Sequence, residues 1–137
     1  MNFAFYGQAI MTNRTAARPF RAQQLADATA RVARHGGTIV AEYFDVYPDR
    51  LNAWRHRRQA WRLLSAIEDP QRIFDAIIVG DTATALTGTQ YEDLLVRCTE
   101  HGVQLWLPEI DEPIDFDNEG HQEAIEDKLW IVPPRRL

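Results

Sequence analysis

The run from Phe74 to Gly80, which reads FDAIIVG, constrains the fold of this chain more than any other segment. It carries a single charged residue, Asp75, and its apolar side chains alternate onto both faces of an extended strand. A strand that is apolar on both faces is covered on both faces, as parallel strands are in α/β proteins. The run therefore predicts a buried strand with helices above and below it.

Three more strands and three helices are expected to alternate with this run. β-Branched and aromatic residues predict strands over residues 2–6, 38–44 and 103–107. Apolar residues at helical spacing predict helices that begin at Pro19, Trp54 and near Tyr91. The alternation predicts an α/β fold, a single three-layer domain in which a mostly parallel sheet of four to five strands carries helices on both faces.

Two of the predicted helices end at the same dipeptide, His35-Gly36 and His101-Gly102, and a strand follows each at once. Glycine is the usual residue where a chain leaves a helix, and a histidine there complements the helix dipole. Such short returns leave the longer loops at the opposite edge of the sheet, where parallel sheets bind their ligands. These loops are residues 7–18, 45–53, 80–88 and 108–120.

The 137 residues suffice for one compact domain, and their charge is divided unevenly. Residues 1–62 carry a balance of +6 and residues 63–137 one of −11, which gives the net charge of −5. Residues 1–108 are expected to form the α/β domain and residues 109–137 an acidic C-terminal extension, in which a short helix is one option. Fourteen of the fifteen basic residues are arginine, which suits a phosphate or carboxylate partner.

Several classes of protein are disfavoured. The single cysteine, Cys98, excludes an internal disulfide and fits a reducing cytoplasm, which is the expected location. No apolar run approaches the roughly 20 residues of a membrane span, and the first residues lack the pattern of a signal peptide. No glycine-rich phosphate loop occurs, so neither a cofactor nor a small-molecule substrate is expected.

Five short segments read FAFYG from residue 3, HGGTIVAEYFD from 35, WRHRRQA from 54, FDAIIVG from 74 and HGVQLWLPE from 101. In this order and at this spacing they resemble the catalytic domain of the serine recombinases, the resolvase/invertase family, over residues 2–124. The resemblance implies a resolvase-like α/β domain. That family continues with a long assembly helix and a DNA-binding domain, whereas this sequence soon meets two prolines, so a degenerate and truncated relative is expected.

The letters YGQAIMT, at the end of the first predicted strand, stand where the family has its Tyr-x-Arg-Val-Ser-Thr segment. Through the resemblance, Ile10 falls on the nucleophilic serine and Gln8 on the arginine two residues earlier. The family's phosphate-gripping arginines after the third strand map to residues 83–87, which carry no charge. Two positions are retained, because Gln24 maps to a glutamine of the first helix and Arg57 to an arginine at the start of the second.

An isoleucine cannot attack phosphorus, and phosphoryl transfer also needs positive charge around the transferred group. The resemblance therefore predicts a catalytically inactive recombinase-like protein, an interaction or regulatory module that pairs with itself or with an intact recombinase. A DNA-associated protein that does not cleave is the alternative. The weakest hypothesis is a recombinase with relocated chemistry, for which Thr12 and Thr15 are the nearest hydroxyls. Ser65, the one serine, lies in an apolar helical stretch far along the chain.

The densest positive patch surrounds the predicted start of the second helix. Its basic residues are Arg50, Arg55, His56, Arg57, Arg58 and Arg62. The five arginines are the candidate DNA-binding residues, since phosphate contacts from such a patch give binding that falls steeply with salt. Pairing of these arginines with the nine carboxylates between residues 109 and 127 is the favoured alternative.

Three further motifs have plainer explanations. Residues 115–126 nearly match a calcium-binding loop, but Pro113 excludes a regular incoming helix, so no metal is expected. Cys98 and His101 lie one helical turn apart, a spacing that suits a catalytic pair. A buried Cys98 on an apolar stripe and a His101 that caps the helix explain the same spacing better. Tryptophans can stack on bases, but three of the four lie in apolar periodic segments typical of a core: Trp54, Trp61 and Trp106.

Overall fold

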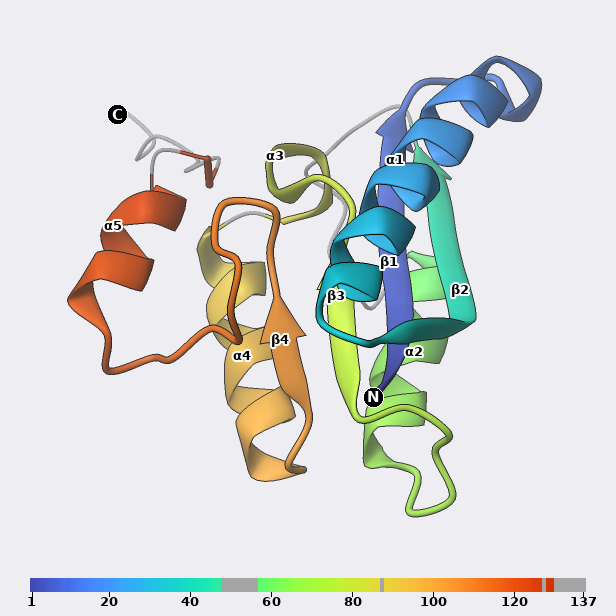
Figure 1. Ribbon diagram of the computed structural model, residues 1–137. Helices are drawn as coiled ribbons and strands as arrows, with labels where there is room; N and C mark the ends of the chain where they lie inside the picture. The colour runs from blue at the N-terminus through green and yellow to red at the C-terminus, as the bar shows by residue number, and fades with distance from the viewer. Residues whose placement is uncertain (48–56, 87, 127, 130–137) are drawn as a thin grey trace, which may run out of the picture.

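In a computed structural model of the protein, the chain forms a four-stranded parallel sheet in the order β2-β1-β3-β4 (Figure 1). The structure describes residues 1–47, 57–86, 88–126 and 128–129. The strands are β1 (Asn2–Ile10), β2 (Thr38–Tyr47), β3 (Ala76–Val79) and β4 (Gln104–Trp106). The helices are α1 (Arg14–Arg34), α2 (Arg58–Glu68), α3 (Thr82–Ala85), α4 (Gly88–Glu100) and α5 (Glu119–Glu126). The predicted α/β class and its parallel sheet are confirmed.

Helices cover both faces of the sheet, as a three-layer arrangement requires. On one face Phe3 and Phe5 of β1 pack with Ala28 and Val32 of α1. On the other face the alternate side chains of the same strands pack with α2 and α4, and Figure 1 shows α1 on the near side of the sheet with these two helices behind it. Because successive side chains of a strand point to opposite faces, β1 and β3 supply both clusters and are apolar almost throughout.

The start of α1 is the main error among the predicted elements. Residues 7–18 are predicted as a loop, but β1 continues into this segment and α1 begins within it. The side chain of Asn13 caps the helix by accepting hydrogen bonds from the backbone N–H groups of Thr15 at 2.8 Å and Ala16 at 3.4 Å. Pro19 therefore lies in the interior of α1 and not in its first turn. At this interior position its missing N–H removes one helical hydrogen bond.

The two predicted helix ends at His-Gly are confirmed. Gly36 has a φ of 72° and Gly102 a φ of 68°, in the left-handed region that glycine adopts without a steric penalty. The residue after each glycine donates its backbone N–H to a carbonyl of the last helical turn, at 2.8 Å in both cases. These closed turns let β2 and β4 begin directly after their helices.

Trp61 corrects a predicted core position. Its side chain on α2 is 56% exposed, whereas Leu63 and Ile67 belong to the fully buried face of this helix. Trp106 of β4 is buried, as expected. Trp54 and the predicted beginning of the helix lie outside the described residues.

The acidic segment after β4 packs on the main core through two buried apolar residues, with Ile110 and Leu129 partly buried against the same cluster. Ile114 and Ile125 are buried in the same cluster as β3, β4 and α4, although the division at residue 108 stays a prediction. α5 supplies the short helix left as an option here, and α3 adds a turn of helix within the predicted loop 80–88. Across the part of the chain that the structure describes, every helix is too short or too polar to cross a lipid bilayer.

Candidate functional site

The position that the resemblance assigns to the family's nucleophilic serine lies at the carboxyl end of β1. Ile10 is the last residue of this strand, is partly exposed, and pairs in register with Tyr47 of β2. Thr12 and Thr15, the nearest hydroxyl groups in the sequence, are exposed beyond the strand end. The aliphatic side chain of Ile10 supplies no nucleophile at this edge of the sheet.

Gln8, at the position of a phosphate-binding arginine in the resembled family, is fully buried in β1. Neither its amide nitrogen nor its amide oxygen has a hydrogen-bond partner among the described residues. Leaving such a group buried and unpaired costs about 1–3 kcal/mol. Gln8 is therefore a buried amide, in register with Asp45 of β2, at a position where an arginine would have to bury its charge.

Gln24, from the middle of α1, is clamped over β1 and β3. Its Nε2 donates a hydrogen bond to the main-chain oxygen of Gln8 at 3.1 Å. Its Oε1 lies so close to the backbone that a Cβ atom added to Gly7 or Gly80 would be 2.5 or 2.7 Å from it. Both positions therefore require glycine while Gln24 stays in place, and this retained glutamine joins the helix to two strands.

Arg57 is fully buried beside two other polar side chains, Tyr6 and Asp45. Its Nη1 donates to the backbone oxygen of Ala85, at the end of α3, over 2.8 Å, and the Tyr6 hydroxyl donates to Asp45 Oδ2 over 2.9 Å. Burial raises the pKa of Tyr6 well above its usual value, the negative charge of Asp45 raises it further, and the charge of Arg57 opposes the shift. One cation, one anion and one hydroxyl thus share a closed site.

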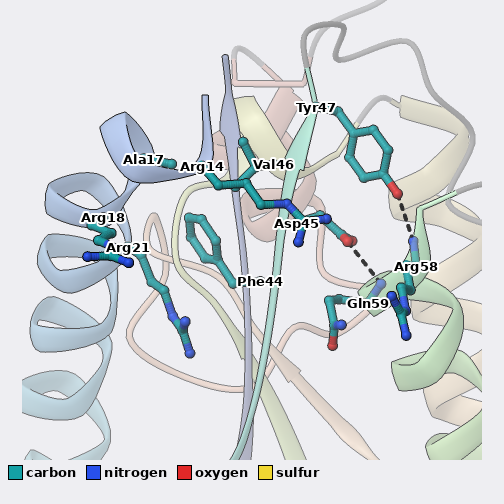
Figure 2. A pocket seen from close by; sticks show the side chains of 10 residues that line it. All are labelled: Arg14, Ala17, Arg18, Arg21, Phe44, Asp45, Val46, Tyr47, Arg58 and Gln59. Atoms are coloured by element: carbon teal, nitrogen blue, oxygen red, sulfur yellow. Dashed lines mark hydrogen bonds between the residues drawn. The ribbon is translucent and has the colours of Figure 1, made fainter. Parts of the chain in front are cut away.

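The first turn of α2 is capped by side chains of β2. The backbone N–H of Arg58 donates to the Tyr47 hydroxyl at 2.9 Å, and the N–H groups of Gln59 and Ala60 donate to the two carboxylate oxygens of Asp45, each at 2.9 Å. Figure 2 shows the bonds to Arg58 and Gln59. A helix N-terminus with free N–H groups binds phosphate readily. Here a carboxylate of the protein already holds that place.

A pocket of about 300 Å³ lies beside this helix start, at the end of β2 and between α1 and α2. Four arginines line it: Arg14, Arg18 and Arg21 from α1 and Arg58 from α2. Asp45 is the single acidic residue among its described lining residues. In Figure 2, Arg18 and Arg21 come from the helix on one side and Arg58 from the helix on the other, and Arg14 points from the start of α1 toward β2.

The four arginines differ in how far their charge is already neutralised. Arg21 pairs with Glu42 at 3.3 Å, and its guanidinium lies 6.0 Å from the centre of the Phe44 ring. For the other three, no carboxylate of a described residue lies within ion-pair distance: Arg14, Arg18 and Arg58. The pocket therefore presents unneutralised positive charge to solvent.

Sequence reasoning missed three of these arginines, two of which, Arg14 and Arg18, lie in the segment 7–18 that it predicted as a loop. Arg14, Arg18 and Arg21 follow the spacing i, i+4, i+7, which places side chains on one face of a helix. The signal that identifies this helix is the capping residue Asn13, which stands directly before it.

The candidate DNA-binding arginines of the predicted patch are separated in the structure. Arg58 and Arg62 are exposed on α2, whereas Arg57 is buried and would have to leave its network to contact a phosphate. Arg50 and Arg55 lie outside the described residues.

Among the described residues, no ion pair joins the exposed arginines of this patch, Arg58 and Arg62, to the acidic segment, and the favoured pairing stays a prediction for Arg50 and Arg55. In the described ranges, the segment's contacts to the rest of the domain include ion pairs from Asp111 to Arg34 at 3.5 Å and to His35 at 3.0 Å, and none reaches Arg58 or Arg62. β2 and β4 form opposite edges of the sheet, and Figure 1 shows α5 on the β4 side, away from β2. The geometry explains why Arg58 and Arg62 do not pair with this segment, because the acidic segment follows β4 and α2 begins beside β2.

Two further interactions hold the beginning of the acidic segment on the sheet. Arg31 of α1 donates to the backbone oxygens of Leu107 at 2.8 Å and Ile110 at 3.2 Å. The Thr82 hydroxyl donates to Glu109 at 2.7 Å. The carboxyl end of β4 is therefore closed by α1 and α3.

The remaining sequence motifs have local structural roles. In the calcium-like segment, Asp115 accepts the backbone N–H of Asp117 at 2.9 Å, and within the described ranges no three His, Cys, Asp or Glu side chains gather as metal ligands. Burial raises the pKa of the Cys98 thiol to about 12, so at neutral pH it stays protonated. A thiol in this state packs in the core and is not a nucleophile.

No protein-family model and no curated protein matches this sequence. In fold, the chain is similar to the C-terminal catalytic domain of ISC1926 TnpA, an IS607-like serine recombinase, with a TM-score of 0.65 and 13% identity over 93% of this chain and 77% of that one. It is also similar to a resolvase family site-specific recombinase from Streptococcus pneumoniae, with a TM-score of 0.69 and 15% identity over 93% and 85%. The resolvase-like fold inferred from the five short segments is confirmed.

Proposed function

We propose that this chain is a non-cleaving relative of the recombinase catalytic domain that acts by binding a partner, as an interaction or regulatory module. The observation that carries the proposal is the end of β1, where Ile10 offers no nucleophile and Gln8 is buried without a charge. The retained residues support it too, because Gln24 and Arg57 hold backbone and core in place. A working phosphoryl-transfer site needs open positive charge around a nucleophile.

A groove on α4 supports a protein partner. Val96 and Phe116 are large apolar side chains, 48% and 55% exposed, and both line this groove. Its lining also includes one cation, Arg97, which pairs with Glu68, and three further acidic residues, Glu92, Asp93 and Glu100. Such a surface suits an apolar partner segment with basic flanks. A second copy of this chain or an intact recombinase is the proposed partner, and light scattering after gel filtration, alone and in mixture, tests both.

The absence of cleavage is tested by trapping a covalent protein–DNA intermediate. The chain is incubated with a pool of nicked duplexes, and adducts are sought on denaturing gels, with an active serine recombinase and its own site as the positive control. We expect no adduct from this chain and none from Ile10→Ser, because a hydroxyl alone replaces neither the arginine whose position Gln8 occupies nor the arginines that map to the uncharged residues 83–87. An adduct with the wild-type chain would contradict the proposal.

A DNA-associated role without cleavage is the second candidate, favoured by the arginines that the acidic segment leaves uncovered. Arg58 and Arg62 are exposed on α2, and the acidic segment pairs with the other end of α1. Anisotropy of a fluorescent duplex at low and at physiological salt tests this role. Affinity that falls steeply with salt supports it, and no binding at low salt contradicts it.

A further inference from the structure

The arginine pocket between α1 and α2 carries chemistry that a protein-interaction role does not use. It places four guanidinium groups around about 300 Å³ of space beside a single carboxylate. That carboxylate, on Asp45, already accepts hydrogen bonds from Tyr6 and from the N–H groups of Gln59 and Ala60. The pocket therefore has an excess of positive charge that its own acidic residue does not neutralise.

We propose that this pocket binds adjacent phosphate groups of an anionic ligand through Arg14, Arg18 and Arg58. These three side chains are exposed, and each lacks an ion-pair partner among the described residues. The planar guanidinium fork matches two oxygens of a phosphate group, which makes arginine the preferred residue for such contacts. The site goes beyond the interaction role proposed above and does not depend on it.

The arrangement of the arginines favours more than one phosphate group. Arg14 and Arg18 lie one helical turn apart on α1, which separates their positions along the helix by about 6 Å. Arg58 approaches from α2 on the opposite side (Figure 2). Arg21 completes the lining while its charge is shared with Glu42. Three unpaired cations around one pocket exceed what a single phosphate needs, so neighbouring phosphates on one ligand fit better.

Two sources carry this chemistry, a nucleic-acid strand and a soluble polyphosphate such as a nucleoside triphosphate. In both cases the bound charge is held by side chains alone, because Asp45 and Tyr47 occupy the first N–H groups of α2. Contacts between exposed guanidinium groups and phosphates are screened by salt. Affinity for either ligand therefore falls as the salt concentration rises.

The test measures binding of inorganic pyrophosphate and ATP by calorimetry and of a fluorescein-labelled single strand by anisotropy, all at low salt. The variant is Arg14→Ala with Arg18→Ala, which places good helix formers at exposed positions of α1 and is checked by circular dichroism. Arg34→Ala is the matched control, because it removes an exposed arginine from the same helix outside the pocket.

Wild-type protein is expected to bind at least one probe, with the double variant about ten- to a hundredfold weaker and the Arg34→Ala control within about twofold. If the strand binds, the slope of log affinity against log salt concentration becomes shallower by about 1.4 in the double variant, since each phosphate contact to a single strand contributes about 0.7. Binding of the strand alone assigns the site to nucleic acid, and binding of ATP or pyrophosphate alone assigns it to a soluble polyphosphate. Failure of all three probes, or equal weakening by the control, overturns the proposal.

Separate measurements distinguish this inference from the function proposed above. A covalent adduct in the cleavage assay would contradict the non-cleaving role and leave the phosphate site standing. If the wild-type protein binds none of the phosphate probes, the phosphate site is refuted and the non-cleaving role is unaffected. Comparison of Arg58→Ala with Arg62→Ala sharpens the assignment, since only Arg58 lines the pocket, whereas a general charge effect of α2 predicts equal losses.

Discussion

Arg57 and Arg58 are neighbours in the sequence and occupy opposite environments. Arg57 is fully buried, donates to Ala85 and shares a closed network with Tyr6 and Asp45. Arg58 is exposed at the rim of the arginine pocket. The chain turns into α2 between them, because Arg57 has an extended backbone and Arg58 is the first helical residue. One peptide unit thus separates an arginine that stabilises the fold from one that is free to bind a ligand.

The largest expected effect comes from breaking the buried side of this comparison. Arg57→Ala leaves the Ala85 carbonyl without its hydrogen-bond donor, removes a buried cation from beside Tyr6 and opens a cavity, so we expect a loss of about 3–5 kcal/mol in the free energy of unfolding. Urea unfolding followed by circular dichroism measures this loss.

Arg58→Ala is the matched control for that measurement. Its exposed side chain has no ion-pair partner among the described residues, so its removal is expected to change the free energy of unfolding by less than about 0.5 kcal/mol. Equal losses for the two variants would mean that burial does not separate the roles of these arginines.

Alkaline pH gives the next largest effect, through Tyr6. Burial and the nearby Asp45 hold the pKa of Tyr6 well above the usual 10.0, so the unfolded chain loses this proton at a lower pH than the folded protein. The folded protein then binds more protons, and the free energy of unfolding falls by up to ~1.4 kcal/mol per pH unit above about pH 10. Below pH 10 this contribution is fully present. Urea unfolding at pH 8 to 11, in steps of about one unit, measures the slope.

Tyr6→Phe is the control, since phenylalanine has no proton to lose. Its stability should decline less steeply with pH than that of the wild type. Cys98, whose pKa is also raised, contributes in the same direction to both proteins, so the difference between them isolates the hydroxyl of Tyr6. Parallel slopes for the two proteins would rule out this role for Tyr6.

The smallest of these effects concerns the unpaired amide of Gln8. Gln8→Leu removes a buried group without hydrogen-bond partners among the described residues, and we expect the protein to gain about 1 kcal/mol. Gln24→Leu is the counterpart, because it removes the hydrogen bond to the Gln8 carbonyl and is expected to cost about 1 kcal/mol. Thermal unfolding of the two variants decides the matter, and a loss for both would show that Gln8 makes a needed contact.

The central strands were predictable from the sequence because their residues are mostly apolar, as strands buried on both faces require. The run 74–80 is apolar on both faces, and it forms the buried strand β3 between β1 and β4. The start of α1 was not predictable from apolar periodicity, since few side chains of its first two turns are buried. It depends on one cap, Asn13, and this error concealed the arginines of the pocket.

The candidate site was only half predictable. The resemblance identified Ile10, Gln8, Gln24 and Arg57 as a set that lacks a nucleophile. It did not reveal that Arg57 points inward, because that depends on Tyr6 and Ala85, which come from other elements and meet Arg57 only in the folded chain. Single-sequence patterns report local preference and burial, whereas the partner of a buried cation is a long-range property.

The position of β1 also has a consequence for how the protein is made. β1 is the first strand along the chain and a central strand of the sheet, with β2 on one side and β3 on the other. β3, at Ala76–Val79, comes much later in the sequence than β1. During synthesis the apolar edge of β1 that pairs with β3 stays unpaired until β3 has left the ribosome, which exposes it to wrong pairing. The bonds from Arg31 to Leu107 and Ile110 come later still. The nascent chain therefore completes its sheet from the centre outward, and a chain that ends before Ile110 lacks the last of these closures.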